Sequence, residues 1–80
     1  MQFDKEVLFI GTKEMVLKDG TVMNTVTFYV DADTVDVNVL ASNVPVMSAV
    51  RSLSFGDKAH ATFALRKRDN VYRLSLAGLA

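Results

Sequence analysis

Strict alternation of apolar and polar residues is the feature that most limits what this chain can fold into. Residues 34–40, TVDVNVL, place three valines on one side of an extended chain and Asp36 and Asn38 on the other. Residues 22–30, VMNTVTFYV, are equally rich in β-branched and aromatic side chains. This composition and a period of two are typical of half-buried β-strands. We therefore expect a mainly β protein in which these segments are neighbouring strands.

The turn between these two strands determines which side chains face outward together. A turn at Ala32-Asp33 would place Tyr29 opposite Asp36 and would bury the valines of both strands. The polar side chains expected on the outer face are Thr25, Thr27, Tyr29, Asp36 and Asn38.

The dipeptide Asp19-Gly20, just before residues 22–30, is a strong signal for a two-residue type I′ hairpin turn. The register of that turn would place Lys13 opposite Val26, on the face that should be buried. A charged side chain conflicts with burial there, so we expect a β-bulge near Lys13 that shifts the phase by one residue. The residues before the turn then form the first strand of a three-stranded meander.

Another two-residue turn is expected at Asp69-Asn70, within residues 63–76, FALRKRDNVYRLSL. Its register opposes Arg66 and Arg73 across the two strands. Like charges in this position destabilise a strand pair by some tenths of a kcal/mol and up to about 1 kcal/mol, whereas a bound anion would reverse the sign. The other expected pairs are Arg68 with Val71, Lys67 with Tyr72, Leu65 with Leu74 and Phe63 with Leu76.

Residues 42–53, SNVPVMSAVRSL, have apolar residues at helical spacing. Asn43 suits an N-cap and Pro45 suits a first helical turn, so we expect a short helix over residues 44–53 that plugs the end of a sheet. The element order is then three strands, one helix and a final two-stranded hairpin. This is the order of the oligonucleotide/oligosaccharide-binding (OB) fold. We predict a single domain over residues 1–80, a five-stranded OB-type antiparallel barrel with one short helix between strands 3 and 4.

The net charge is zero, but positive charge gathers at one end of the chain. Residues 1–65 hold eight acidic and five basic residues, whereas residues 66–80 hold four basic residues and one acidic residue. The distribution of charge, and not its total, therefore supports a nucleic-acid ligand. The chain has no cysteine and no segment near the roughly 20 apolar residues that cross a bilayer. We expect a soluble, cytoplasmic protein with no membrane partner.

The sequence resembles a known class of small barrels at three places. LSFGDKAHATFAL, residues 53–65, is similar to the passage from the helix to the fourth strand of OB domains, and KDGTVMNTVTFYV, residues 18–30, to their first hairpin. RKRDNVYRLSLAGL, residues 66–79, is similar to their last hairpin. Compact chains of this length resemble the small single-stranded-DNA-binding proteins of bacteriophages and plasmids. The resemblance implies a five-stranded barrel, single-stranded DNA or RNA as ligand, frequently a homodimer, and a role in phage or plasmid DNA replication or recombination.

Binding of a single strand combines a positively charged groove with aromatic side chains on which bases stack. The hairpin between the last two strands is one of the loops that this fold uses for nucleic acid. We expect phosphates to be bound, with little sequence specificity, by Arg66, Lys67, Arg68 and Arg73. The other expected contacts are base stacking on Tyr29 and Tyr72, polar contacts from Thr27 and Asn38, and weaker contributions from Lys18 and Lys58.

Other groups of residues give no support to catalysis or to a cofactor. The acidic run DADTVD, residues 31–36, lacks the glycine and glutamate of a calcium loop, and His60 has no evident metal or catalytic partner. No phosphate loop and no nucleophile–histidine–acid set is present, so we expect no enzyme, no metal and no cofactor.

Two alternatives remain open, one to the nucleic-acid-binding function and one to the OB-type fold. One is a small β-barrel that contacts a protein partner in a phage or plasmid assembly and has no nucleic-acid ligand, which the neutral total charge and the valine-rich strands favour. The other is an SH3-like barrel, which also has five short strands. The early position of the predicted helix disfavours the SH3-like fold.

Overall fold

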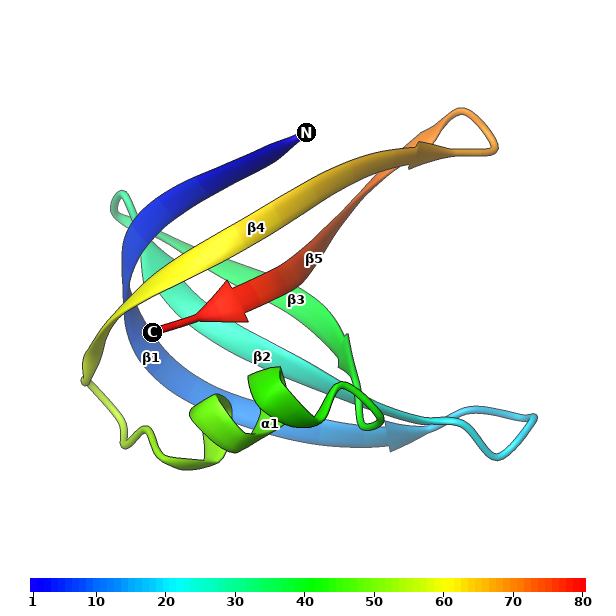
Figure 1. Cartoon of the computed structure of the whole chain (residues 1–80), viewed down its shortest axis with the longest axis horizontal. Coiled ribbons are helices and arrows are strands. Elements are labelled where there is room, and N and C mark those ends of the chain that lie inside the picture. The colour runs from blue at the N-terminus through cyan, green and yellow to red at the C-terminus, as the bar shows by residue number, and fades with distance from the viewer.

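The alternating segments form five strands that curve into one closed barrel (Figure 1). The computed structural model describes every residue from Met1 to Ala80. Its elements are β1 (Gln2–Val16), β2 (Val22–Val30), β3 (Asp33–Leu40), α1 (Val44–Arg51), β4 (Lys58–Arg68) and β5 (Val71–Leu79). The strand order is β1-β2-β3-β5-β4, and β1 also pairs with β4 to close the ring. The predicted OB-type barrel with one short helix between β3 and β4 is confirmed.

One strand contact is parallel, which the prediction of an antiparallel barrel did not include. β3 and β5 run in the same direction and meet through a single residue pair, Asn38 and Ser75. Five is an odd number, so a ring of five strands cannot be antiparallel at every contact. One parallel contact is therefore required, and it is the seam of the barrel with the fewest paired residues.

Aromatic rings from three strands fill the middle of the barrel. Phe28 is fully buried, and its ring centroid lies 6.3 Å from that of Phe9 and 6.1 Å from that of Phe63, both edge-on. Edge-to-face contacts of this kind are favourable. The rest of the buried cluster is mostly valine and alanine, namely Val7, Val26, Val37, Val39, Val46, Met47, Val50, Ala59, Ala61 and Leu76. Phe28 thus packs at the centre of the core, between aromatic rings from two other strands.

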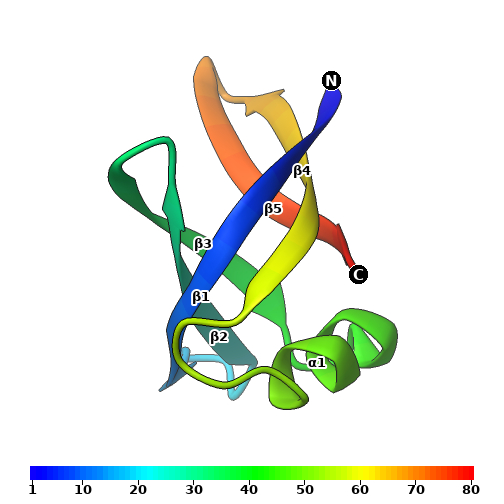
Figure 2. The ribbon, with the colours of Figure 1, turned by 90° about the vertical axis from the view of Figure 1, so that its left-hand side faces the viewer.

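Helix α1 covers one end of the barrel (Figure 2). As the helical spacing predicted, it buries Val46, Met47 and Val50. It begins after Asn43, as predicted, but the Asn43 side chain makes no capping hydrogen bond. It ends at Arg51 rather than at residue 53, and Leu53 packs against the core from the loop that follows. The helix is neither long enough nor apolar enough to cross a membrane.

The loop between β1 and β2 has three residues, not two. The Leu17 N–H donates to the Thr21 carbonyl oxygen at 2.8 Å, and the Gly20 N–H donates to the Leu17 carbonyl oxygen at 2.9 Å. Gly20 has a φ of 87°, whereas Asp19 is not in the left-handed region. A type I′ turn needs a positive φ at both central residues, so the predicted turn type is wrong.

The longer loop shifts the β1–β2 register by one residue and removes the conflict at Lys13. Lys13 lies opposite Thr25 rather than Val26, and its side chain is exposed. The predicted bulge does occur, but it lies earlier in β1, between Phe9 and Gly11. The bulge allows the first half of β1 to keep its own apolar side chains inward despite the shifted register beyond it.

The β2–β3 turn is Asp31-Ala32, one residue earlier than predicted, with φ of 49° and 68°. Tyr29 therefore lies opposite Thr34 and not opposite Asp36. The error displaces each partner by two residues, and side chains alternate with a period of two. The pairs were therefore predicted wrongly, while the assignment of residues to the inner and outer faces was correct.

The β4–β5 hairpin folds as predicted. Asp69 and Asn70 have φ of 51° and 64°, as a type I′ turn requires. The structure has every predicted pair, namely Arg68 with Val71, Lys67 with Tyr72, Arg66 with Arg73, Leu65 with Leu74 and Phe63 with Leu76. The register shifts only beyond the predicted pairs, between Thr62 and Phe63.

The carboxylate of Asp19 makes the β1–β2 loop sensitive to pH. It accepts a hydrogen bond from the Thr21 N–H at 2.9 Å, and this bond lowers the pKa of Asp19 below its usual value of 3.8. Because the folded-state pKa is depressed, the stabilisation is present above the unfolded-state pKa and is lost as pH falls through the folded-state pKa. We expect the Thr21 amide resonance to titrate with a midpoint below 3.8 in an NMR pH series. Asp19→Asn should abolish this titration, and a midpoint above the usual value would contradict the assignment.

Candidate nucleic-acid interface

The β4–β5 hairpin projects beyond the barrel (Figure 1). All four of its basic side chains are exposed, namely Arg66, Lys67, Arg68 and Arg73. None of them forms an ion pair, because the one ion pair of the structure joins Lys5 and Asp31 at 2.8 Å. Arg66 lies directly opposite Arg73, a like-charge arrangement that costs some tenths of a kcal/mol and up to about 1 kcal/mol. An anion between the two guanidinium groups would remove this cost.

The two faces of this hairpin carry different side chains. Because side chains alternate along a strand, the arginines at 66, 68 and 73 lie on the outer face. Lys67 and Tyr72 lie on the other face, which continues the inner side of the barrel. The Lys67 Nζ is 5.8 Å from the centre of the Tyr72 ring, and Tyr72 is 65% exposed. Tyr72 is thus accessible, but it is separated from the three arginines.

A row of polar side chains crosses four strands on the outer surface of the barrel. The members of the row pair in sequence from β1 to β5, namely Lys13, Thr25, Asn38 and Ser75. The Thr25 hydroxyl donates to the Asn38 amide oxygen at 3.1 Å. Ser75 follows Arg73 on the same face of β5, so the row leads to the opposed arginines. We call the complete set the outer strip: Lys13, Thr25, Asn38, Ser75, Arg66 and Arg73.

The surface at the outer strip is hollowed where β3 and β5 separate. A hollow of about 350 Å³ is lined by Asn38, Arg66 and Ser75, among others. The Asn38 oxygen accepts from Thr25, which leaves both N–H groups of its amide without a protein partner. Hydrogen-bond donors of Asn38 and Arg66, both predicted site residues, therefore line one hollow and suit a phosphate or a base edge.

An apolar row runs beside the outer strip. It consists of the paired residues Met15, Met23 and Leu40. Met15 and Leu40 are each 47% exposed. Flexible methionine side chains adapt to different partners, so this row suits contact with bases of any identity.

Tyr29 lies away from the outer strip, at the far end of β2. It lines an apolar hollow of about 290 Å³ with Leu8, Ile10 and Phe55. From Thr25 to Tyr29 the strand runs about 13 Å. The predicted grouping of Tyr29 with the basic hairpin therefore does not occur.

Thr27 is also less available than predicted. Its hydroxyl donates to the Asp36 carboxylate at 2.7 Å. Asp36 lies directly opposite Thr27, so a phosphate that approached this hydroxyl would meet a negative charge. Thr27 therefore lies beside the outer strip rather than in it.

The two remaining lysines lie in different places. Lys18 is in the β1–β2 loop, and this hairpin and the β4–β5 hairpin project on the same side of the barrel (Figure 1). Lys58 pairs with Leu8 at the start of β4, about 26 Å along the strand from Arg66. Lys58 therefore lies too far along β4 to contact a strand on the outer strip, whereas Lys18 lies five residues beyond Lys13 along the first hairpin.

Sequence reasoning missed Lys13 and Ser75, for two different reasons. The predicted two-residue turn placed Lys13 opposite Val26, and the conflict with burial was attributed to a bulge near Lys13, so Lys13 was not considered as a surface contact; the three-residue loop is what places it opposite Thr25. Ser75 gains its position from the single contact between β3 and β5. No local pattern specifies that contact, because the two strands are far apart in the sequence.

Comparisons with known proteins give no relative for the chain. No family model matches it, and neither the characterised proteins nor the solved structures provide a match. No three histidine, cysteine or carboxylate side chains gather where they could hold a metal ion. The function is therefore inferred from two observations, the five-stranded OB-type barrel and the geometry of the outer strip.

Proposed function

We propose that this protein binds single-stranded DNA along the outer strip with little sequence specificity. The observation that carries the proposal is the pair Arg66 and Arg73, which face each other across two strands with no carboxylate partner. A repulsive pair at the end of a polar row is stabilised when a phosphate lies across it.

The strand would bind mainly through its backbone. Phosphates would contact the opposed arginines and Arg68 at one end of the outer strip and Lys13 at the other. The N–H groups of Asn38 would donate to a phosphate or a base edge in the hollow between them. Bases would lie over the apolar row, and the exposed Tyr72 ring offers a stacking surface where the strand passes the hairpin. Because most of these contacts carry no sequence information, binding should be largely independent of sequence.

The biological role that we propose follows from the resemblance. Small single-stranded-DNA-binding proteins of phages and plasmids support replication and recombination, and the same role would suit this chain. The sequence does not distinguish DNA from RNA as the ligand, so oligo-U is a necessary comparison with oligo-dT. A strong preference for oligo-U would change the ligand but not the site.

Salt dependence tests the proposal. Each phosphate neutralised on a single strand contributes about 0.7 to the slope of log affinity against log salt concentration. Four basic side chains, at positions 13, 66, 68 and 73, predict a slope of about 2–3 for fluorescent oligo-dT. Titrations from low to physiological salt measure it. Absence of binding at micromolar protein in low salt, or a slope near zero, would contradict the proposal.

A second candidate function, contact with another protein subunit, is favoured by a separate observation. Phe55 is 80% exposed and Tyr29 is 42% exposed beside their apolar hollow, outside the outer strip. A second copy of the chain is the partner that the resemblance implies. Phe55→Ser should then reduce self-association in light scattering and leave oligo-dT binding unchanged. A chain that is monomeric at every concentration would count against this second function.

A further inference from the structure

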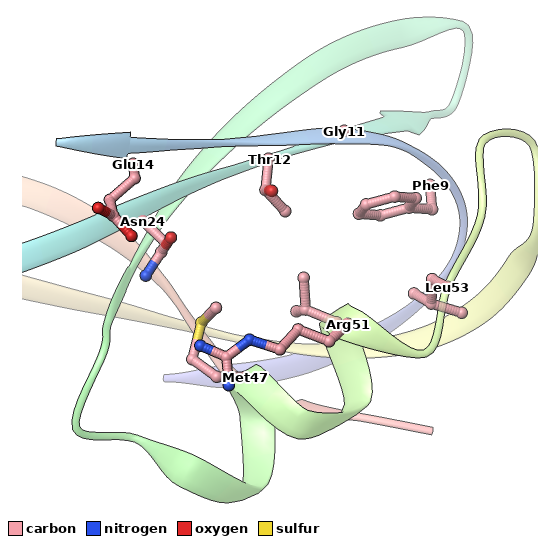
Figure 3. A pocket seen from close by; sticks show the side chains of 9 residues that line it. Phe9, Gly11, Thr12, Glu14, Asn24, Met47, Arg51 and Leu53 are labelled. Atoms are coloured by element: carbon pink, nitrogen blue, oxygen red, sulfur yellow. The ribbon is translucent and has the colours of Figure 1, made fainter.

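A hollow of about 580 Å³ lies between α1 and the β1–β2 hairpin (Figure 3). It is separate from the outer strip, because it opens on the inner face of β1 and β2. Sites for small molecules commonly have about 300–1,000 Å³. The residues that line it include Phe9, Glu14, Asn24, Val50, Arg51 and Leu53.

Asn24 is a polar residue at a position where packing of the core alone would favour an apolar one. It occupies an inward position of β2, two residues from the fully buried Val26, and is 7% exposed. Its amide makes no hydrogen bond within the protein, and its polar atoms retain access to the hollow, into which Figure 3 shows the side chain pointing. No group of the protein therefore occupies the donors and the acceptor of this amide, which are free to bond to a molecule in the hollow. An amide at this position can donate hydrogen bonds to a ligand and accept one from it.

Two opposite charges line the same hollow without neutralising each other. Glu14 pairs with Asn24 across the strands, so their side chains are neighbours. Arg51 reaches the hollow from the last turn of α1. Neither Glu14 nor Arg51 forms an ion pair. The hollow therefore offers an unpaired carboxylate, an unpaired guanidinium and an amide.

The hollow has a polar end and an apolar end. Figure 3 shows Glu14 and Asn24 at one end, with Phe9 and Leu53 at the other. The strand register agrees with the picture, since Glu14 lies about 16 Å along β1 from Phe9. A ligand that fits has a charged head and an apolar side chain.

We propose that this hollow binds a small zwitterion with an apolar side chain, an α-amino acid or a dipeptide. Its ammonium group donates to Glu14, its carboxylate accepts from Arg51, and the Asn24 amide bonds to the head between them. The apolar side chain lies against Phe9, Val50 and Leu53. This function is independent of DNA binding, because none of these residues belongs to the outer strip.

Calorimetric titration of the intact chain with leucine and with leucyl-leucine tests the proposal and distinguishes the two sources of the zwitterion. One of the two should bind saturably. 3-Methylbutylamine, which lacks the carboxylate, and N-acetylleucine, which lacks the ammonium group, should bind at least about tenfold more weakly. Absence of saturable binding by both zwitterions, or binding of either analogue as tightly as the zwitterion, would overturn the proposal.

Three substitutions test the assigned contacts. Asn24→Leu, Glu14→Gln and Arg51→Gln should each weaken binding at least about tenfold. Arg51 is exposed on the surface of α1, so Arg51→Gln should fold even if another of the three variants does not. Lys58→Gln is the control and should bind normally, and oligo-dT binding should be unchanged in Asn24→Leu. Normal zwitterion binding by all three variants would refute the site.

Discussion

Phe28→Ala is expected to lower the free energy of unfolding by about 3–5 kcal/mol, which is the range for truncation of a buried phenylalanine. Phe28 is fully buried and contacts the rings of Phe9 and Phe63 edge-on. Its removal leaves a cavity that these rings cannot fill, since they come from two different strands of a closed barrel. Native domains have a total stability of about 5–15 kcal/mol, so this variant should be close to unfolding at room temperature.

Urea unfolding followed by circular dichroism measures the effect. Phe55→Ala is a matched control, because it deletes the same atoms from a side chain that is 80% exposed. At concentrations where the chain is monomeric, it should change stability by less than about 0.5 kcal/mol. Similar losses in the two variants would mean that the barrel core is not packed as described.

Arg66→Glu is expected to weaken binding of oligo-dT at least about tenfold at low salt. The substitution removes a phosphate contact at the hollow of the outer strip and introduces a charge that repels the strand. It also replaces a like-charge pair with an opposite-charge pair across from Arg73. A cross-strand pair of opposite charge contributes about 0.2–1 kcal/mol, which raises the melting temperature by about 1–8 °C in a domain of this size.

This combination of weaker binding and higher stability excludes misfolding as the cause of the loss. Lys58→Glu is the matched control, because it makes the same change of charge on the same strand at the far end from Arg66. It should weaken binding only slightly, through the change in net charge. Equal losses in the two variants would show that binding depends on total charge and not on the outer strip.

How much of the fold could be predicted depended on the turns. Asp69-Asn70 determined the β4–β5 register from the turn as far as the pair of Phe63 and Leu76, because both residue types tolerate positive φ and the flanking apolar residues agree with a two-residue loop. Asp19-Gly20 was ambiguous, since a glycine with positive φ also closes a three-residue loop. Ala32 at a φ of 68° was unpredictable, because alanine rarely adopts that conformation.

The site was predictable only where it lies within one hairpin. The opposed arginines followed from a single turn, whereas the outer strip depends on contacts among four strands that local patterns do not specify. Tyr29 was assigned to the correct face of β2, but the distance along the strand separates it from the hairpin. Alternation along β2 already places Asn24 inward, but the hollow that it faces is formed by β1, β2 and α1 together and is not specified by any local pattern.

NMR chemical-shift mapping can locate a single strand of DNA on the surface of the protein, and we expect it along the outer strip. Oligo-dT is added to the ¹⁵N-labelled chain, and the amide shifts are followed residue by residue. We predict that the largest shifts fall on Lys13, Thr25, Asn38, Ser75, Arg66 and Arg73, while Lys58 and His60 stay unchanged. Shifts confined to the region of Tyr29 and Phe55, with none on the outer strip, would contradict binding of the strand along the outer strip.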